Sequence, residues 1–305
     1  MKLTDQSLKN LVNNYEAILT REYKTTPATG LTRVKLGEMY AQVAVVPTDT
    51  DTVTVAAGGD NELANTLTST VKQSTLHLES ELPFKDGATG NTVSTGANIV
   101  MGTISDMTIV NGVITNFSGS NGSTTIINGR EVDTERGIQV VVYLPRHMTI
   151  YVGDVYGTVA IVKPHDGDLI FAPTSQCDLQ TDDVHGDVEI DLSGSSQGDI
   201  GRVKGSADVD VSGSGSVNFN AVEGAFVAQI SGSGDATIAE GTTSRMRASV
   251  SGSGDIQVHS TVTNDARLRV SGSGKITVRE VGGDVDTNVS GSGTITANGE
   301  RYRRR

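Results

Sequence analysis

The 305-residue sequence has no tryptophan, only 4% aromatic residues and a single cysteine, Cys177. One cysteine cannot form an internal disulfide, so no disulfide framework is expected. The scarcity of large apolar side chains argues against a thick globular core, and the 36 glycines favour a narrow core of small aliphatic residues. No apolar run is long enough to cross a membrane as a helix. The first residues contain no hydrophobic signal region, so we expect a cytoplasmic protein, a chain that begins after a removed leader, or a non-standard export route.

Positive charge is also scarce, because 24 lysines and arginines face 36 aspartates and glutamates, for a formal net charge of −12. Bulk binding of nucleic acid needs a basic surface, so we expect no nucleic-acid partner.

Catalytic and metal-binding patterns are weak. None of the five histidines has a paired metal spacing, and His165-Asp166-Gly167-Asp168 is typical of a turn. Gly194-Ser195-Ser196-Gln197-Gly198 matches G-x-S-x-G, but that motif needs a following helix, and here a strand pattern continues. Asp235 and Asp255 resemble a calcium ladder, although the equivalent positions elsewhere hold Ser216, Lys275 and Thr294. We therefore predict no catalytic, cofactor-binding or metal site, and no enzyme activity.

What the sequence does contain is a repeat of Ser-Gly-Ser-Gly, which begins at Ser212, Ser231, Ser251, Ser271 and Ser290. The successive serines lie 19, 20, 20 and 19 residues apart. Apolar and polar residues alternate on both sides of each copy, as in Val209-Asp210-Val211 before it and Val217-Asn218-Phe219 after it. This period of two indicates strands with one buried face. A fixed period of this length predicts a β-solenoid with 19 to 20 residues per coil.

The repeated corners are expected to be structural. Glycine adopts backbone angles that other residues avoid, and small residues can stack above one another without crowding. The predicted corner residues are Ser212, Gly213, Ser231, Gly232, Ser251, Gly252, Ser271, Gly272, Ser290 and Gly291.

Residues that face solvent are expected to form columns along the rod. One column contains Glu189, Asp208, Val227, Arg247, Arg267 and Asp286, and the other contains Asp191, Asp210, Gln229, Ser249, Arg269 and Asn288. This face begins acidic, becomes basic and ends mixed, and Arg267 is expected to pair with Asp286. It can be an ordinary solvated face or a charge-patterned binding surface.

The chain divides into five segments. Residues 1–25 form an N-terminal amphipathic helix that caps the rod or serves membrane contact or oligomerisation, and residues 26–83 are strands that join the solenoid. Residues 84–137 are an insertion rich in Gly, Ser, Thr and Asn, in which Asn111-Gly112 and Asn128-Gly129 predict hairpins, with a flexible linker as the alternative. Residues 138–299 are the solenoid repeats. Residues 300–305 form a basic C-terminal tail that blocks the end of the stack or anchors an anionic partner.

The Val-Ser-Gly-Ser-Gly-Asp-Ile pattern resembles the bacterial "putative auto-transporter adhesin, head GIN domain" family. Residues 53–61 and 75–78 look like the opening of that family, and residues 138–150 look like its entry into the repeats. The resemblance covers roughly residues 30–82 and 135–298. It implies a single-stranded right-handed parallel β-helix, a cell-surface or secreted location and an adhesive role, with no catalytic residues.

We therefore predict an all-β solenoid that serves as a non-enzymatic, adhesin-like binding or structural module for a protein or glycan, without a cofactor. One alternative is a cytoplasmic scaffold that self-associates through its solenoid ends. Another is a polysaccharide-acting enzyme, which would use the carboxylates of Glu189, Asp191, Asp208 and Asp210.

Overall fold

The computed structural model describes residues 23–84, 106–110, 113–119, 122–127, 130–133, 136–174 and 176–303. The described residues are nearly all β, and the body of the protein is a parallel β-solenoid, as the repeat predicts. Most of the helix expected over residues 1–25 lies outside the described residues, which begin at Tyr23. Residues 23–25, which the sequence analysis placed in the helical segment, belong to the first strand instead.

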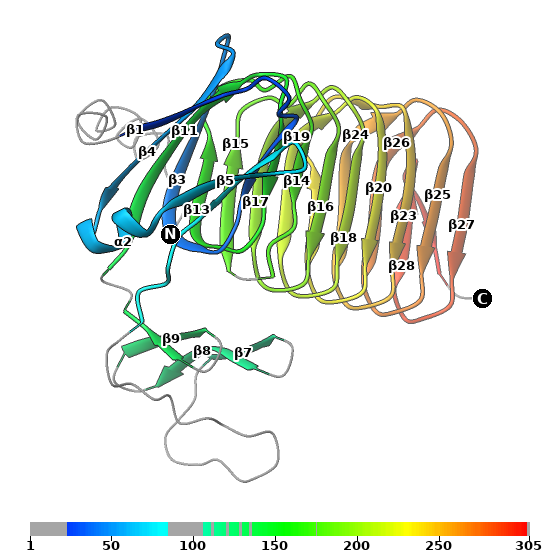
Figure 1. Ribbon diagram of the computed structural model, residues 1–305. Coiled ribbons are helices and arrows are strands. Elements are labelled where there is room, and N and C mark those ends of the chain that lie inside the picture. The colour runs from blue at the N-terminus through cyan, green and yellow to red at the C-terminus, as the bar shows by residue number, and fades with distance from the viewer. Residues whose placement is uncertain are drawn as a thin grey trace.

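Two large sheets form the body of a rod, in which strands lie side by side along its length (Figure 1). Sheet A has 14 strands, which in spatial order are β1 (Tyr23–Pro27), β4 (Thr52–Gly59), β11 (Ile138–Pro145), β3 (Met39–Thr48), β13 (Val155–Ile161), β15 (Cys177–Thr181), β17 (Gln197–Val203), β19 (Ser216–Val222), β21 (Asp235–Ile238), β24 (Asp255–Val262), β26 (Lys275–Val281), β28 (Thr294–Ala297) and β29 (Glu300–Tyr302), with β22 (Thr242–Thr243) beside β24.

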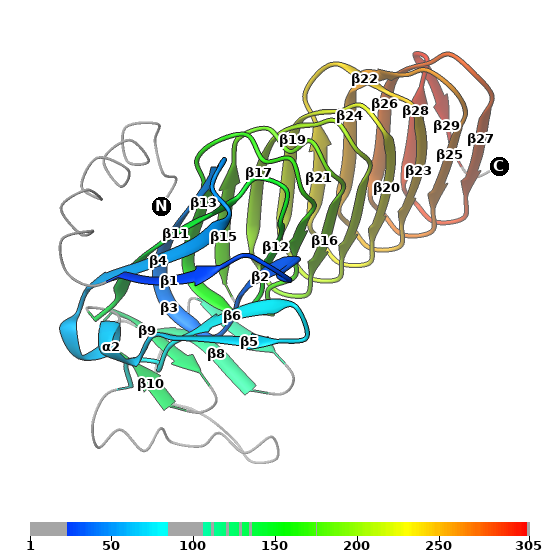
Figure 2. The same ribbon diagram turned by 45° about the horizontal axis from the view of Figure 1, so that its top comes forward.

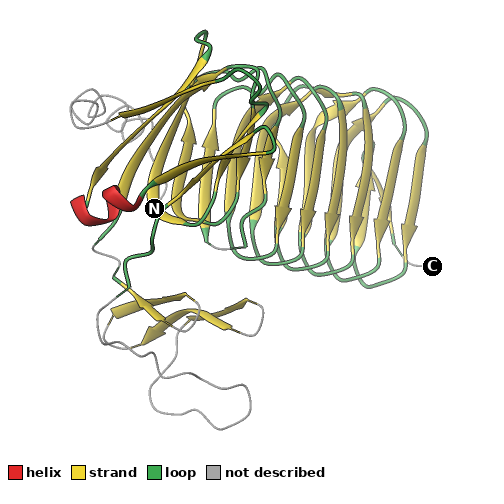
Figure 3. Ribbon diagram, in the orientation of Figure 1, coloured by secondary structure: helices red, strands yellow, loops and turns green. Residues whose placement is uncertain are grey.

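Sheet B has 11 strands, which in spatial order are β27 (Val285–Val289), β25 (Ala266–Val270), β23 (Arg245–Val250), β20 (Ala225–Ile230), β18 (Ala207–Val211), β16 (Val188–Leu192), β14 (Leu169–Phe171), β12 (Thr149–Val152), β2 (Arg33–Leu36), β6 (Thr75–Glu79) and β5 (Thr68–Lys72). The one helix within the described residues is α2 (Asn61–Thr66), drawn in red in Figure 3.

From β14 to β28 the chain alternates between sheet B and sheet A and completes about seven turns. Each turn runs along a strand of sheet B, through a Ser-Gly-Ser-Gly corner where the repeat is regular, and back along a strand of sheet A. Neighbouring turns pair in parallel register, so that Val211 lies beside Ile230 and Ile230 lies beside Val250. The period of the sequence is therefore the length of one turn.

The first turns have an order in space that differs from their order in sequence. β2 pairs with β6 on one side and β12 on the other, and β3 lies in the same way between β11 and β13. The turn formed by β2 and β3 is thus enclosed between turns that come later in the chain. The chain passes from β11 to β12 across this enclosed turn, where the amide of Arg146 donates to the carbonyl of Thr48 at 3.0 Å.

Antiparallel strands close most of the rod's edges. At the N-terminal end β4 pairs with β11, β1 pairs with β4 and β5 pairs with β6, all antiparallel (Figure 2). At the other end β29 pairs antiparallel with β28, so residues 300–302 of the expected basic tail form a strand. Among the described strands, β27 alone ends a sheet as a parallel strand. Closed edges of this kind deter further strand addition.

The insertion contributes a separate four-stranded antiparallel sheet C. Its strands, in spatial order, are β10 (Arg130–Val132), β9 (Gly122–Ile127), β8 (Val113–Gly119) and β7 (Asp106–Val110). β7 pairs with β8, and β9 pairs with β10, on either side of the two Asn-Gly pairs. Phe84 forms an antiparallel bridge with Val132 where the insertion leaves and rejoins the body.

The core lies between sheets A and B and consists mostly of Val, Ile, Leu and Ala. Phe219 and Phe226 are each 1% exposed, and their rings meet edge to face with centroids 5.9 Å apart. Burial of a side chain of this size stabilises the fold by roughly 1.5–3 kcal/mol. One turn alone cannot offset the entropy of about twenty ordered residues, which is why stacking is required.

Candidate functional site

The Ser-Gly-Ser-Gly corners form one long edge of the rod, and their role is structural. Their serines are exposed, and the amide of each first serine donates to the turn below, as Ser251 does to the carbonyl of Ile230 at 2.8 Å. Glycine is needed because a Cβ atom on Gly232 or Gly252 would overlap the carbonyl oxygen of the corner below. Among the described glycines, positive φ angles occur elsewhere, so the expected need for unusual backbone angles is wrong at these corners.

The recurring Gly-Asp pairs have a related structural role. The Oδ1 atom of Asp168 accepts the amide of Asp187 at 2.9 Å, and the Oδ1 atom of Asp187 accepts the amide of Ser206 at 2.7 Å. In the same manner Asp235 accepts the amide of Asp255 at 2.8 Å. These aspartates bond the next turn. Within the described residues, no group of three or more His, Cys, Asp or Glu side chains could hold a metal ion.

Two side chains that could act as nucleophiles are buried in the core. Ser196, the central serine of the G-x-S-x-G match, is 0% exposed, and its Oγ atom accepts the amide of Cys177 at 3.0 Å. Cys177 is itself buried, which raises the pKa of its thiol. Neither group is placed to act as a nucleophile on a ligand.

His165 is 0% exposed, and neither ring nitrogen has a partner in hydrogen-bonding geometry. Burial lowers the pKa of His165 to about 4, although backbone groups of Asp168 and Met148 lie near enough to oppose part of the change. The equivalent position in the next turn is Val184. His165 is therefore a neutral core residue.

A cleft of about 880 Å³ opens where the insertion leaves the body. Four glutamates contribute to its wall, together with apolar residues from α2 and from the segment between β6 and the insertion. These residues are Glu38, Glu62, Glu79, Glu81, Leu63, Leu82, Pro83 and Phe84. No local motif in the sequence marks this cleft, because its walls come from positions 38 to 136.

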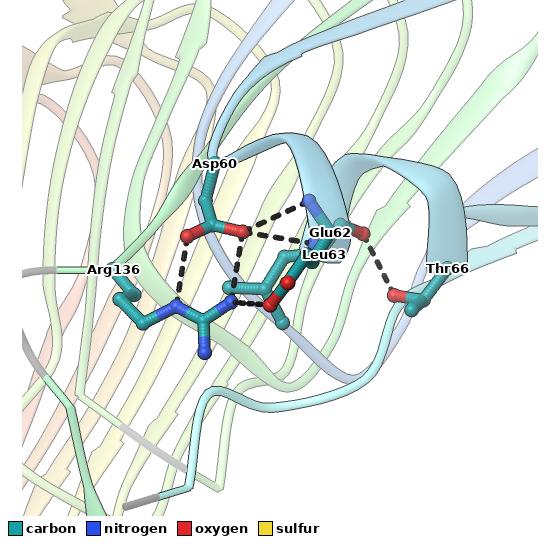
Figure 4. A network of polar contacts seen from close by, with 5 residues as sticks. All are labelled: Asp60, Glu62, Leu63, Thr66 and Arg136. Carbon is teal, nitrogen blue, oxygen red and sulfur yellow. Dashed lines mark hydrogen bonds and ion pairs between the residues drawn. The ribbon is translucent and has the colours of Figure 1, made fainter.

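Among the described residues of the cleft wall, Arg136 is the one cation, and it is held by the carboxylates beside it (Figure 4). The Nε atom of Arg136 donates to Asp60 at 2.7 Å, and its Nη2 atom donates to Glu62 at 2.7 Å. Asp60 also caps α2 by accepting the amides of Glu62 and Leu63. The hydrogen bond from Arg136 is the main reason that the pKa of Asp60 falls to about 2. Since Arg136 is engaged, the cleft presents mainly negative charge to a ligand.

A second patterned surface is the outer face of sheet B. The parallel register places Glu189 beside Asp208 and Asp191 beside Asp210, as the columns predict. Desolvation, followed by the charges of Asp191 and Asp208, raises the pKa of Asp210. These four carboxylates, which a polysaccharide-acting enzyme would use, lie on adjacent strands and do not line the cleft described above.

Further along the same face lie the arginines. Arg247 is in register with Arg267, and Arg267 with Asp286. The expected pair forms, with 3.1 Å between the Nε atom of Arg267 and Asp286, and Arg269 reaches the same carboxylate at 2.9 Å. The two arginines lower the pKa of Asp286.

Comparison with known proteins supports the resemblance seen in the repeat. The model of the family described as "Putative auto-transporter adhesin, head GIN domain" matches residues 188–300, the stretch from β16 to the start of β29. That description supports an adhesin-like, non-enzymatic module at this coarse level, and it names no ligand. No protein among the curated sequences matches this chain. No helix within the described residues is long and apolar enough to cross a membrane.

Two solved structures share the fold. A putative adhesin from Parabacteroides merdae ATCC 43184 is 12% identical, with a TM-score of 0.54, and the likeness covers 90% of this chain and 95% of that one. A putative adhesin from Parabacteroides distasonis ATCC 8503 is 14% identical, with a TM-score of 0.50 and coverage of 90% and 96%. At such low identity these likenesses show the fold alone.

Proposed function

We propose that this protein is a non-enzymatic binding module of the adhesin type. The match of its repeat region to the adhesin head family supports this proposal. Its solenoid is a rigid rod, and the ligand binds at its N-terminal end, in the cleft beside the insertion. The observation that carries this proposal is the cleft itself, where four glutamates and a few apolar residues converge and Arg136, the single arginine among the described lining residues, is already paired.

The chemistry of the cleft favours a cationic ligand. Glu38, Glu79 and Glu81 line the cleft wall, and no arginine or lysine of the described residues forms an ion pair with them; the Nδ1 atom of His77 lies 3.9 Å from Glu79. Low-dielectric walls lined by one sign of charge concentrate ligands of the opposite sign. Leu63, Leu82 and Phe84 add apolar contact. A protein segment that carries lysine or arginine beside an apolar residue fits this wall better than a neutral glycan does.

A binding screen tests the proposal. The full chain is passed over immobilised matrix proteins and glycans, and a positive partner is tested again with a Glu38→Gln, Glu79→Gln and Glu81→Gln variant. We expect at least about a tenfold loss of affinity, since removing charges that face a bound cation costs about 1.5 kcal/mol or more. Deletion of residues 86–131, replaced by a short Gly-Ser linker, should also weaken binding and leave the β circular dichroism intact.

The matched control removes three carboxylates from other parts of the rod through Asp199→Asn, Asp235→Asn and Asp255→Asn, and it should bind as the unmodified chain does. Equal losses in the cleft variant and the control would contradict a site in the cleft. Release of reducing sugar from any glycan of the screen would contradict the non-enzymatic proposal.

The rival proposal, a scaffold that assembles end to end, has less support. Three of the four sheet ends are closed by antiparallel strands among the described residues, and only β27 leaves a parallel edge. Pairing through one five-residue strand is a small contact for a filament.

A further inference from the structure

The charged residues on the outer face of sheet B are arranged symmetrically, and this face is not part of the proposed binding cleft. β16 and β18 carry the four carboxylates, β23 and β25 carry arginines, and β20 lies midway between them. The outward residues of β20 are Ala225, Val227 and Gln229, which have no charge. An acidic half and a basic half are therefore placed at equal distances on either side of a neutral central strand.

Within one copy these charges are poorly satisfied. Glu189 lies beside Asp208, and Arg247 lies beside Arg267, although like charges in neighbouring positions of a sheet destabilise it. Among the described residues no ion pair is found for Arg247 or for the four carboxylates of β16 and β18. Only Asp286 reaches the arginines of β25. The arrangement costs stability in the isolated rod, and a complementary surface would recover it.

A second copy of the same face is such a surface. We infer that two copies pair through the outer faces of their B sheets, about a two-fold axis that runs parallel to the strands and passes between their β20 strands. This axis brings β18 of one copy onto β23 of the other, and β16 onto β25, because the sheet order is β16, β18, β20, β23, β25.

The pairing that results places an arginine opposite three of the four carboxylates. The axis keeps the position along the strand, so Asp208 faces Arg247 of the second copy and Glu189 faces its Arg267. In the second column Asp191 faces Arg269, and Asp210 faces Ser249. Val227 meets Val227 at the axis, where the partly buried side chain gains an apolar contact. Closed two-fold dimers of this isologous kind are the commonest protein assembly.

The alternative symmetry can be excluded by charge. A two-fold axis along the length of the rod would place β16 on β16 and β23 on β23, so that carboxylates would face carboxylates and arginines would face arginines. Like charges that meet in an interface cost several kcal/mol and suppress wrong pairings. The charge pattern therefore selects one orientation of the second copy.

The size of the face sets the strength of the pairing. Seven strands of sheet B, from β14 to β27, are centred on β20. With strands ~4.8 Å apart and a rise of ~3.3 Å per residue, the area of this face is roughly 500 Å² per copy. Stable complexes bury about 800 Å² per partner. The contact is therefore weak and is sensitive to salt, and it becomes effective where many copies are displayed together. The inference rests on the proposed adhesin-type function, because display of many copies together makes the weak contact effective. It names a second copy of the chain as one partner.

The test uses two charge-reversed variants of the full chain. One carries Arg247→Glu and Arg267→Glu, so its face is acidic in both halves, and the other carries Glu189→Arg and Asp208→Arg, so its face is basic in both halves. Sedimentation velocity at low salt should show self-association of the unmodified chain and at least about thirtyfold weaker self-association of each variant alone. A one-to-one mixture of the two variants should associate again, because each acidic position then faces an arginine.

A control variant changes charge on the outer face of sheet A, through Gln257→Arg and Thr277→Glu, which lie in register with each other. It should self-associate as the unmodified chain does. Recovery in the mixture also shows that both variants fold. The inference is overturned if the unmodified chain stays monomeric to about millimolar concentration, or if the mixture associates no better than its components. Binding to another partner without self-association would leave the proposed function in place and overturn this inference alone.

Discussion

Replacing Gly252 with alanine tests why the corners consist of glycine and serine. The added Cβ atom would overlap the carbonyl oxygen of Gly232 and lie 2.8 Å from its carbonyl carbon. Both atoms belong to backbone that is fixed by the stack, so no flexible side chain can move aside. The turns on either side of Gly252 must therefore separate at this corner.

The expected cost follows from the contacts at the corner. Overpacking of a closely packed site costs ~1–3 kcal/mol. Separation also strains the hydrogen bond from Ser253 to Gly232 at 3.0 Å and the one from Ser273 to Gly252 at 3.0 Å. At about 1 kcal/mol for each bond, Gly252→Ala should destabilise the fold by about 3–5 kcal/mol.

Urea unfolding followed by circular dichroism measures the change, with hydrogen exchange to locate it, because repeat proteins need not unfold in a single step. The matched control is Ser251→Ala, an exposed corner residue whose loss should cost less than about 0.5 kcal/mol. A Gly252→Ala protein as stable as the Ser251→Ala control, with unchanged exchange in the adjacent turns, would refute the explanation from close stacking.

Three further predictions concern the core and the cleft wall. His165→Val should stabilise the protein, because valine also occupies the equivalent position of the next turn, Val184. In the unmodified chain the free energy of unfolding should fall by up to about 3 kcal/mol as pH falls from about 6.5 to about 4, and His165→Val should abolish this loss. Urea unfolding at several pH values measures both effects. The loss arises because only the unfolded chain takes up the proton in this range, so a pH profile unchanged by the substitution would contradict it. Phe219→Ala should cost about 3–5 kcal/mol in the same assay, and a loss below about 1 kcal/mol would show that the ring is not tightly packed. Arg136→Gln should raise the pKa of Asp60 from about 2 toward its ordinary value in a carboxyl NMR titration, and no change would exclude Arg136 as the main cause.

The regular part of the fold could be predicted because its signal is repeated. The Ser-Gly-Ser-Gly period specifies the length of a turn, and the alternation beside it, as in Val209-Asp210-Val211, specifies which face is buried. The charge columns follow from the same period, since a residue 19 or 20 positions away must lie beside its equivalent. This is why the pair between Arg267 and Asp286 could be predicted, and the structure confirms it.

The N-terminal part could not be predicted in the same way. The placement of β2 and β3 between later turns depends on long-range pairing, and short alternating segments do not specify their neighbours. The cleft was missed for the same reason, since Glu38, Glu81 and Arg136 are far apart in sequence and have no common motif. The need for glycine at the corners comes from contact between turns, which a single turn of sequence does not reveal.

The self-complementary face of sheet B is tested most directly by cross-linking at its symmetry axis. Val227→Cys places a thiol on β20, and the native Cys177 is 0% exposed and should not react. Stacked sheets lie ~10 Å apart, which is too far for a direct disulfide, so a short bismaleimide reagent is used. The account predicts that Val227→Cys yields a covalent dimer at low salt, whereas Glu189→Cys and Thr277→Cys do not. Equal yields from all three variants, or no dimer from Val227→Cys, would contradict it.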